Sequence, residues 1–218
     1  LQNYFVGANN INVLKPNGQF GTRLRGGKDA ASPRYILTQL SDITYKIFPE
    51  ADFPVLNYLD DDGMSVEPDY YAPIIPFALV NGCQGIGTGF SHKGTSFNPI
   101  ELSNYLKRRL NNPTEQIGDI VPYYEGFTGE IVKVATHKYL VKGKFEIIDS
   151  KTIRITELPV GTWTTDYKND LEYMMADKDK KGKKKKPIIK NFRDLCTNDG
   201  IDFTVTMPDG KINSLRNK

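Results

Sequence analysis

The stretch GQFGTRLRGGKDAASPRYI (Gly18–Ile36) sets the interpretation of the first part of the chain, because a loop gives way to an ordered element within it. Its glycines favour loops and tight turns, since glycine tolerates positive φ angles. Ser32 and Pro33 then indicate a helix start, because serine is a good N-cap and proline fits the first helical position. Apolar residues follow at helical spacing: Ile36, Leu40, Ile43 and Ile47. The sequence therefore predicts a helix from Ser32 with one buried face, with Arg34 and Tyr35 in its first turn.

Downstream of this segment the pattern is mixed. An acidic connector over roughly 50–69 follows the predicted helix, and the apolar run PIIPFALV (Pro73–Val80) predicts a short strand. Asn98 and Pro99 predict the start of another helix. The apolar stripe of that helix is Leu102, Leu106 and Leu110. These signals mix predicted helices with a predicted strand.

The second half of the chain has the period of strands. Apolar and polar residues alternate near 129–135, 138–148 and 152–158, which predicts strands, and a helix is expected around 165–175. The following lysine-rich stretch, Lys178–Lys186, is most often a solvated, disordered loop in such a context, and contact with DNA is the less favoured alternative.

Composition excludes several classes of protein. The chain has 218 residues, 39% of them hydrophobic and 25% charged, which is ordinary for a soluble globular protein. No apolar run approaches the roughly 20 residues that span a bilayer, so no membrane partner is expected. Two cysteines and two histidines form no metal-binding pattern, and no metal site is predicted.

Charge is distributed unevenly, although the net charge is only +3. Before Tyr35 a single acid, Asp29, stands among five basic residues: Lys15, Arg23, Arg25, Lys28 and Arg34. Such a basic patch suits a polyanion, and a solvated surface is the alternative interpretation.

Tyr35 beside Arg34 is a candidate nucleophile, although a packed aromatic residue is the commoner explanation of this pair. A phenol has a pKa of about 10, so ionising it at pH 7 costs about 4 kcal/mol. A neighbouring guanidinium and a helix N-terminus would lower this cost and stabilise charge on a phosphate under attack. Arginine suits that role because its fork of N–H groups matches phosphate oxygens.

The glycine-rich segment Gly82–Gly89 has two competing explanations. Its spacing does not fit a dinucleotide-binding turn, and it lacks the lysine of a phosphate loop. Ile86, held between glycines, is either a buried core residue or an apolar wedge inserted between base pairs. The carboxylates of Asp60, Asp61 and Asp62 favour a solvated turn over a metal site, because alternate side chains of a strand point apart.

Long motifs resemble the active-site region of eukaryotic-type (type IIA) DNA topoisomerase II. They are Gly18–Ile36, VEPDYYAPIIPFALVNGCQGIGTGF (Val66–Phe90), FVGANNIN before them and ITELPVGTWTTDYK (Ile155–Lys168) after them. The resemblance covers nearly the whole chain and is densest over 5–90. It implies an α+β fold, with the C-terminal part of a winged-helix domain over 1–73 followed by a partial, mixed α/β tower domain over 74–218.

The resemblance also implies roles for individual residues. Tyr35 corresponds to the nucleophile that forms a 5′-phosphotyrosyl bond with DNA, and Arg34 to the arginine that assists at that phosphate. Ile86 corresponds to the isoleucine that kinks the duplex. Three further residues fall near the cleaved strand and are expected to contact DNA: Gln19, Arg23 and Lys28.

Partners and cofactors follow from the same resemblance. It implies an ATP-dependent enzyme that acts on double-stranded DNA as a homodimer. Mg²⁺ and ATP would be bound by modules upstream of this chain, and the coiled-coil arm and exit gate would lie beyond Lys218. The enzyme is expected in the nucleus, or in a cytoplasmic viral factory if the source is viral. Departures from the family pattern at Arg25, Cys83, Gln84 and Phe90 hint at a protist or a large DNA virus.

Three rivals remain open at this stage. A non-catalytic winged-helix DNA-binding module would show salt-dependent binding without a covalent adduct. A nucleotide-binding enzyme built on Gly82–Gly89 would bind a dinucleotide. A purely structural scaffold would leave the basic stretch before Tyr35 without a purpose.

Overall fold

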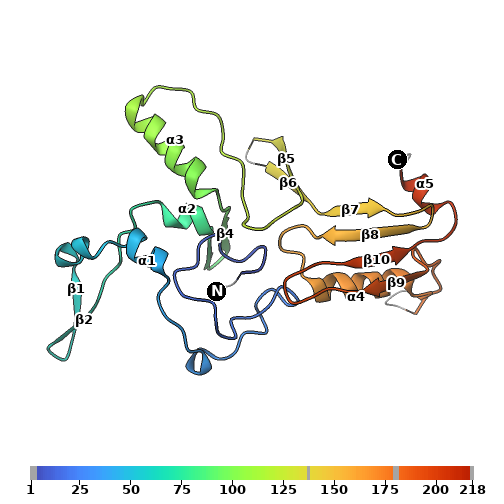
Figure 1. Cartoon of the computed structure of the whole chain (residues 1–218), viewed down its shortest axis with the longest axis horizontal. Coiled ribbons are helices and arrows are strands. Elements are labelled where there is room, and N and C mark those ends of the chain that lie inside the picture. The colour runs from blue at the N-terminus through green and yellow to red at the C-terminus, as the bar shows by residue number, and fades with distance from the viewer. Residues whose placement is uncertain (1–3, 137, 179–181, 217–218) are drawn as a thin grey trace.

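Two regions of different construction make up the chain (Figure 1). The computed structural model describes residues 4–136, 138–178 and 182–216. Separate helices, hairpins and connecting segments form the first region, and a four-stranded sheet with a helix packed along it forms the second. The structure is therefore α+β, as the sequence predicts.

The second region is built on one antiparallel sheet. Its strand order is β7 (Lys144–Ile147), β8 (Thr152–Glu157), β10 (Phe203–Thr206) and β9 (Asn191–Asp194). Helix α4 (Thr164–Met175) lies along one face of this sheet (Figure 1). A buried apolar cluster fills the space between them: Ile155, Leu158, Leu171, Ile189, Ile201, Phe203 and Val205. Strand β8 and helix α4 confirm the elements predicted near 152–158 and around 165–175, whereas the segment predicted near 138–148 is divided between this sheet (144–147) and a separate hairpin (138–142).

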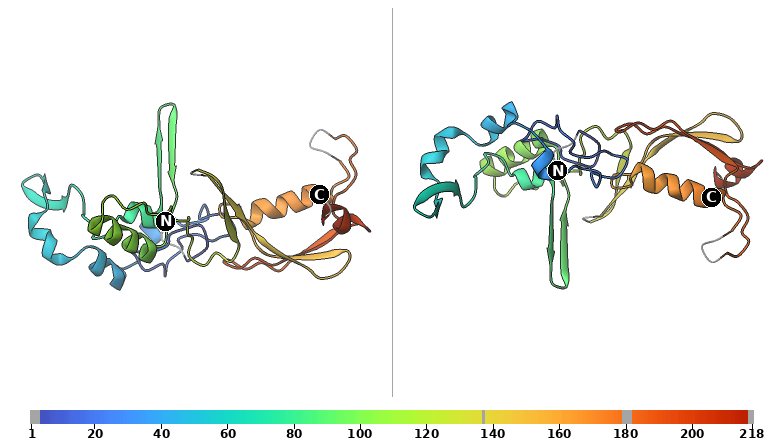
Figure 2. Two further views of the ribbon diagram at one scale, coloured as in Figure 1. Left: turned by 90° about the horizontal axis from the view of Figure 1, so that it is seen from above. Right: turned by 90° about the horizontal axis from the view of Figure 1, so that it is seen from below.

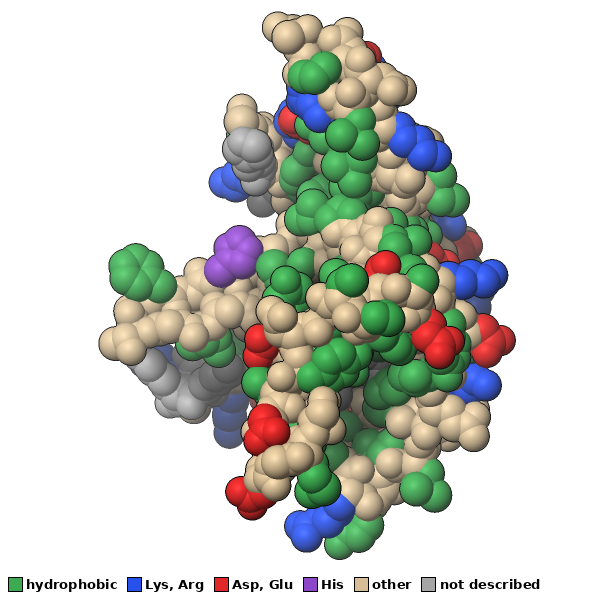
Figure 3. Space-filling view, turned by 90° about the vertical axis from the view of Figure 1, so that its left-hand side faces the viewer, with side chains coloured by type: hydrophobic (Ala, Val, Ile, Leu, Met, Phe, Trp, Pro, Cys, Tyr) green, Lys and Arg blue, Asp and Glu red, His purple; other side chains and the backbone are tan. Residues whose placement is uncertain are grey.

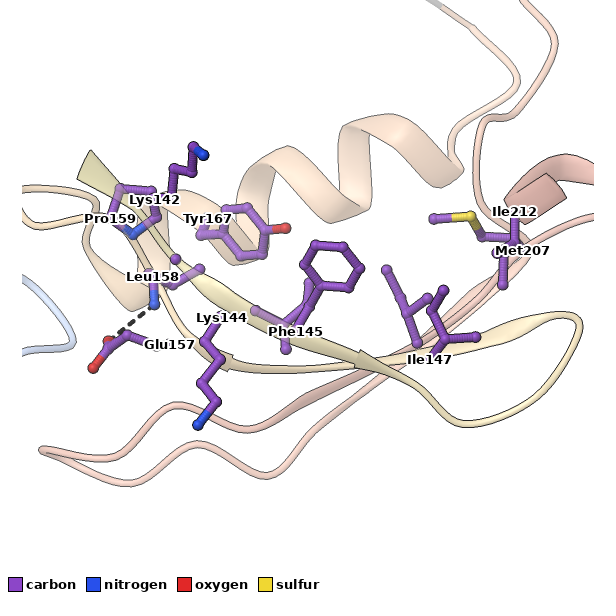
Figure 4. Close-up of a pocket in the computed structure, with 13 residues that line it drawn as sticks. Lys142, Lys144, Phe145, Ile147, Glu157, Leu158, Pro159, Tyr167, Met207 and Ile212 are labelled. Atoms are coloured by element: carbon purple, nitrogen blue, oxygen red, sulfur yellow. Dashed lines mark hydrogen bonds between the residues drawn. The ribbon is translucent and has the colours of Figure 1, made fainter. Parts of the chain in front are cut away.

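Helix α4 leaves the β7 edge of the sheet uncovered. A groove of about 590 Å³ runs along this edge. Phe145, Ile147 and Tyr167 line it, together with Met207 and with Ile212 of the short helix α5 (Lys211–Arg216) (Figure 4). Glu157 lies at one end of the groove, where its carboxylate accepts a hydrogen bond from the Leu158 amide.

The first region consists of short elements joined by irregular chain. In order they are the single turn η1 (Pro33–Tyr35), α1 (Asp42–Ile47), the turn η2 (Glu50–Val55), the hairpin of β1 (Tyr58–Asp61) and β2 (Met64–Pro68), and α2 (Phe77–Asn81). Helix α3 (Pro99–Asn111) follows, and the hairpin of β5 (Glu130–Ala135) and β6 (Lys138–Lys142) connects to the sheet. The longest helix among the described residues is α3, and none of them is long and apolar enough to cross a membrane.

A hairpin arm made of β3 (Cys83–Gly87) and β4 (Phe90–Gly94) projects from this region (Figure 2). It is formed by the glycine-rich segment that raised the possibility of a nucleotide site. A dinucleotide-binding turn joins a strand to a helix, whereas here the segment pairs with the strand that follows it. The topology therefore counts against the nucleotide-binding interpretation.

The predicted helix from Ser32 to Ile47 was wrong. Only Pro33–Tyr35 and Asp42–Ile47 are helical, and the chain between them is largely extended. That intervening segment pairs with an earlier one: the Lys15 amide donates to the Gln39 carbonyl at 2.8 Å, and the Ser41 amide to the Val13 carbonyl at 2.9 Å. This long-range pairing satisfies the backbone groups that a continuous helix would have satisfied locally.

The predicted strand over Pro73–Val80 was also wrong. The end of this run forms α2, which begins after Pro76, and Val80 on it is fully buried. Two prolines in the run, Pro73 and Pro76, lack the N–H groups that a central strand needs. The connector over 50–69 contains η2 and the β1–β2 hairpin, with exposed acids at the turn of that hairpin.

The predicted helix start at Asn98 was confirmed. The Asn98 side chain accepts hydrogen bonds from the amides of Ile100 (2.9 Å) and Glu101 (3.3 Å), so it caps α3 as expected. Only Leu102 of the predicted stripe is deeply buried, since Leu110 is exposed. Part of the lysine-rich stretch, 179–181, lies outside the described residues, as does His137. Lys178 and Lys184 on either side of that gap form an isolated β-bridge.

Candidate active site

Tyr35 and Arg34 lie together on an exposed turn. The Tyr35 side chain is 75% exposed, and the Arg34 guanidinium carbon lies 5.5 Å from the centre of its ring. The turn is closed by the Tyr35 amide, which donates to the Ser32 carbonyl at 2.9 Å. Pro33 favours this conformation because its φ angle is fixed. The pair is therefore accessible to a large ligand, as a nucleophile and its cationic neighbour must be.

The structure corrects one part of the electrostatic argument. A single turn of three residues replaces the long helix whose N-terminus was expected to help ionise the phenol. Aligned peptide dipoles need several turns to accumulate, so η1 adds little. The cationic environment of Tyr35 comes from Arg34 instead.

The loop before Tyr35 is held in shape by its own hydrogen bonds. The carboxylate of Asp29 accepts one bond from the Thr22 amide at 2.9 Å and another from the Thr22 hydroxyl at 2.6 Å. Partial burial raises the pKa of Asp29, but these bonds outweigh that effect and hold the pKa below its usual value. The Ala31 amide then donates to the Gln19 carbonyl at 2.9 Å, so both ends of the loop are fixed close to the Tyr35 turn.

Gly21 and Gly26 allow two close approaches in this loop. A Cβ atom on Gly21 would lie 2.5 Å from the Gly27 Cα, and one on Gly26 would lie 2.2 Å from the Trp163 ring. Both glycines also have positive φ angles, of 98° and 61°. The glycines of this segment thus fold the loop tightly and seat it on Trp163.

Arg23 lies inside the molecule rather than on a DNA-facing surface. It is 3% exposed, and its guanidinium forms an ion pair with the equally buried Glu157 at the end of β8. The prediction that Arg23 contacts DNA directly therefore does not fit its place in the structure. The sequence alone could not place it, because its partner lies far along the chain.

Further bonds join the same loop to the second region. The Arg23 amide donates to the Asn198 carbonyl at 3.0 Å, and the Thr165 amide donates to the Leu24 carbonyl at 3.0 Å. Trp163 also packs edge-on against Phe5, with 5.9 Å between ring centres. The loop before Tyr35 is consequently anchored to the sheet and to the start of α4.

The other expected contact residues are exposed. Gln19 and Lys28 lie at the surface of the loop. Ile86 is 84% exposed on the projecting arm, which excludes the buried-core explanation for this residue in the structure. Ile86 pairs with Ser91 and Gly87 with Phe90, so Ile86 and the equally exposed Phe90 are on opposite faces of the arm.

The sequence analysis missed several residues that shape this site. Glu157 and Trp163 belong to the quoted motif ITELPVGTWTTDYK, but no role was assigned to them. Asn10 of FVGANNIN was missed too: its amide nitrogen donates to the carbonyls of Val80 (2.8 Å) and Tyr123 (3.1 Å). The only available signal was their membership in long motifs, since the contacts of Asn10 with Val80 and of Glu157 with Arg23 join residues 70 and 134 positions apart.

The surface carboxylates offer no obvious metal site. Asp60, Asp61 and Asp62 are exposed around the turn of the β1–β2 hairpin, and Asp60 accepts a hydrogen bond from the Gly63 amide at 3.0 Å. Within the ranges that the structure describes, no three His, Cys, Asp or Glu side chains are grouped so that they could hold one metal ion.

Comparison with known proteins identifies the family. The family model for the A subunit of DNA gyrase/topoisomerase IV matches residues 1–218. The chain is 43% identical to DNA topoisomerase 2 top-2 of Caenorhabditis elegans and 44% identical to human DNA topoisomerase 2-alpha, over 97% of its length in each case. It spans 14% of the length of each of these relatives.

A solved structure agrees with the sequence relatives. The DNA-binding, cleavage and re-ligation domain of Plasmodium falciparum topoisomerase II superposes with a TM-score of 0.88 and 41% identity. The match covers 99% of this chain and 28% of that one. The chain therefore belongs to the family of the DNA gyrase/topoisomerase IV A subunit, and within it resembles the cleavage region of the eukaryotic-type topoisomerase II members.

Proposed function

We propose that this chain is the breakage-reunion segment of a type II DNA topoisomerase and that Tyr35 is its nucleophile. The observation that carries the proposal is an exposed phenol beside a guanidinium, on a turn whose preceding loop is anchored to a sheet. Family membership supports it, because the structural relative is named as a cleavage and re-ligation domain. Residues 1–73 would complete a winged-helix domain, and 74–218 would form part of a tower domain.

The reaction exchanges one phosphoester bond for another. The Tyr35 hydroxyl oxygen attacks a backbone phosphorus of DNA, and the bond from phosphorus to the 3′ oxygen breaks as the tyrosyl bond forms. The phenol proton passes to solvent, and the departing 3′ oxygen takes up a proton. Arg34 offsets the charge that develops on the phosphate oxygens. Resealing reverses these steps without an external energy source, because the phosphotyrosyl bond retains the energy of the bond it replaced.

The remaining parts of the proposal concern the whole enzyme. We propose a homodimer in which each Tyr35 cuts one strand of double-stranded DNA, acting in the nucleus of a eukaryotic cell. Mg²⁺ and ATP would be held outside this chain. ATP binding and hydrolysis would then drive passage of a second duplex through the break.

Ile86 is proposed to bend the cleaved duplex. Its position on a projecting arm, with almost its whole side chain accessible, suits insertion between base pairs. Unstacking one step costs a few kcal/mol, which wider contact between protein and backbone offsets. Gln19 and Lys28 would contact the backbone, which positions DNA without reading its sequence.

Replacing Tyr35 tests the nucleophile assignment. In the intact enzyme, Tyr35→Phe removes the attacking oxygen and should abolish the covalent DNA adduct seen after denaturation with labelled DNA. Tyr45→Phe is the matched control, because Tyr45 is also exposed and lies on the nearby helix α1. Adduct at the wild-type level in Tyr35→Phe, or a DNA-linked peptide that maps to another residue, would overturn the assignment.

Replacing Ile86 tests the wedge. Ile86→Ala should reduce DNA bending, measured by energy transfer between the ends of a labelled duplex, because a methyl group cannot fill an opened base step. Ile100→Ala on α3 removes an equally apolar and exposed side chain outside the arm, and it should leave the bend unchanged. An unaltered bend in Ile86→Ala would remove the wedge role while leaving Tyr35 unaffected.

A further inference from the structure

The buried pair of Arg23 and Glu157 has no part in the chemistry described so far. Among the charged side chains that the structure describes, these two are the buried ones, at 3% exposure each. The Glu157 carboxylate also accepts hydrogen bonds from the Leu158 amide at 2.9 Å and from the Thr128 amide and hydroxyl, both at 3.3 Å. Leu158 directly follows Glu157 and Thr128 lies just before β5, whereas Arg23 comes from the loop before Tyr35 and so joins that loop to the carboxylate.

Stability alone does not explain such a pair. Removing two charges from water costs several kcal/mol per ion, and their attraction often does no more than offset this, so an apolar pair of similar size can be as stable. An ion pair with hydrogen bonds adds a directional constraint on how two segments are placed. Its geometry is satisfied at one relative placement of the two segments, because the guanidinium fork and the carboxylate must face each other.

We propose that Arg23 and Glu157 are positioning residues that fix the loop before Tyr35 on the four-stranded sheet, so that the phenol meets the scissile phosphate in reactive geometry. The catalytic part of this inference rests on the proposed function of Tyr35. Neither residue touches DNA in it. Their effect reaches the reacting phosphate through the backbone of the loop.

The path from the pair to the tyrosine is short and continuous. Thr22, next to Arg23, holds Asp29 through two hydrogen bonds and so closes the loop. The Ala31 amide bonds to the Gln19 carbonyl, and the Tyr35 turn begins directly after it. A shift of Arg23 relative to the sheet would therefore be carried to Gln19 and Tyr35, because these hydrogen bonds tie the segments of the loop to one another.

The test uses the full-length enzyme with three single variants. Arg23→Met keeps a long apolar stem but leaves the Glu157 carboxylate without its cation, and Arg23→Lys restores the charge without the planar fork. Arg154→Gln is the matched control. It breaks the Arg154–Asp202 pair (2.8 Å) on the same strand, β8, but that pair is partly exposed and does not touch the loop.

Two measurements separate positioning from general stability. Hydrogen exchange is followed for the amides of 19–31 and for those of β10 in the core. Adduct formation is followed at saturating DNA, alongside the DNA dissociation constant. We expect Arg23→Met to accelerate exchange in 19–31 but not in β10. It should slow adduct formation by about ten- to a hundredfold, since a displacement of about 1 Å can cost that much, with little change in Kd.

We expect different results from the conservative variant Arg23→Lys and from the control Arg154→Gln. Arg23→Lys should recover part of both effects, and Arg154→Gln should show neither. Three results would overturn the inference: unchanged exchange in 19–31, an equal rise of exchange in β10, or a loss of adduct explained by weaker DNA binding. If the wild-type enzyme formed no adduct at all, the proposed function would be wrong. The hydrogen-exchange result would still decide whether the Arg23–Glu157 pair fixes the loop.

Discussion

The second region, which contains the four-stranded sheet (the sheet region), and the first region, which contains Tyr35 (the tyrosine region), are stabilised in different ways. In the sheet region, apolar side chains pack together between four strands and one helix, and Phe203 at its centre is fully buried. In the tyrosine region, many large apolar side chains remain at the surface, as the space-filling view shows (Figure 3). Tyr35, Leu37, Val55 and Ile86 are among them. The buried side chains of the tyrosine region are scattered, as at Ile47, Val80 and Leu102, and backbone pairing and single side chains such as Asn10 join its segments.

The sheet region acts as a platform with a dense core, and the tyrosine region presents exposed side chains next to it. A sheet with a dense core resists displacement, because core packing leaves few alternative arrangements. Exposed segments without a core can present side chains to a large partner, but they hold their positions only where something anchors them. The loop before Tyr35 combines both properties, since it is an exposed segment fixed to the platform at Arg23, Leu24 and Gly26.

The largest expected effect compares a buried aromatic ring of the sheet region with an exposed one on the projecting arm. Phe203→Ala should destabilise the chain by about 3–5 kcal/mol, because it removes a fully buried ring and leaves a cavity between α4 and the sheet. Phe90→Ala makes the same change on the projecting arm, where the ring is 84% exposed, and it should alter stability by less than about 0.5 kcal/mol. Denaturant unfolding followed by circular dichroism measures both. Equal losses would mean that the arm packs as tightly as the sheet.

The same contrast explains what the sequence could predict. The strand near 152–158 and the helix around 165–175 were predicted correctly because β8 and α4 bury residues such as Ile155 and Leu171 in a local pattern that matches their period. Strands also form within 129–148, although their side chains are exposed or half-buried. The helix over Ser32–Ile47 was wrong because residues 13–15 compete for its backbone, and no local signal reports that pairing. Tyr35 and Arg34 were singled out by long motifs, whereas the burial of Arg23 depends on Glu157, whose approach only the folded chain brings about.

A smaller effect compares two helix starts that had the same sequence signature. Asn98→Ala should cost about 1 kcal/mol, since its side chain caps α3 through two amide hydrogen bonds. Ser32→Ala should change stability by only a few tenths of a kcal/mol, because the Ser32 side chain makes no cap bond to the short turn that follows it. Denaturation midpoints compare the two variants directly. A cost at Ser32 as large as that at Asn98 would indicate that the turn bearing Tyr35 is a true helix start in solution.

The smallest expected effect concerns how the loop before Tyr35 responds to pH. Partial burial raises the pKa of Asp29, but the bonds that its carboxylate accepts from Thr22 outweigh burial and hold the pKa below its usual value. A group with a lowered folded-state pKa stabilises the fold above its unfolded pKa, and this stabilisation is lost as the pH falls through the folded value. The loop should therefore loosen in acid, below the usual titration range of aspartate.

Trp163, the single tryptophan of the chain, packs on Gly26 and can report this loosening through its fluorescence. Asp29→Asn should remove that acid transition, whereas Asp149→Asn, which alters a similarly shifted carboxyl between β7 and β8, should leave it in place. If the fluorescence change persisted in Asp29→Asn, the bonds from Thr22 would not be what keeps the tyrosine loop seated on the platform.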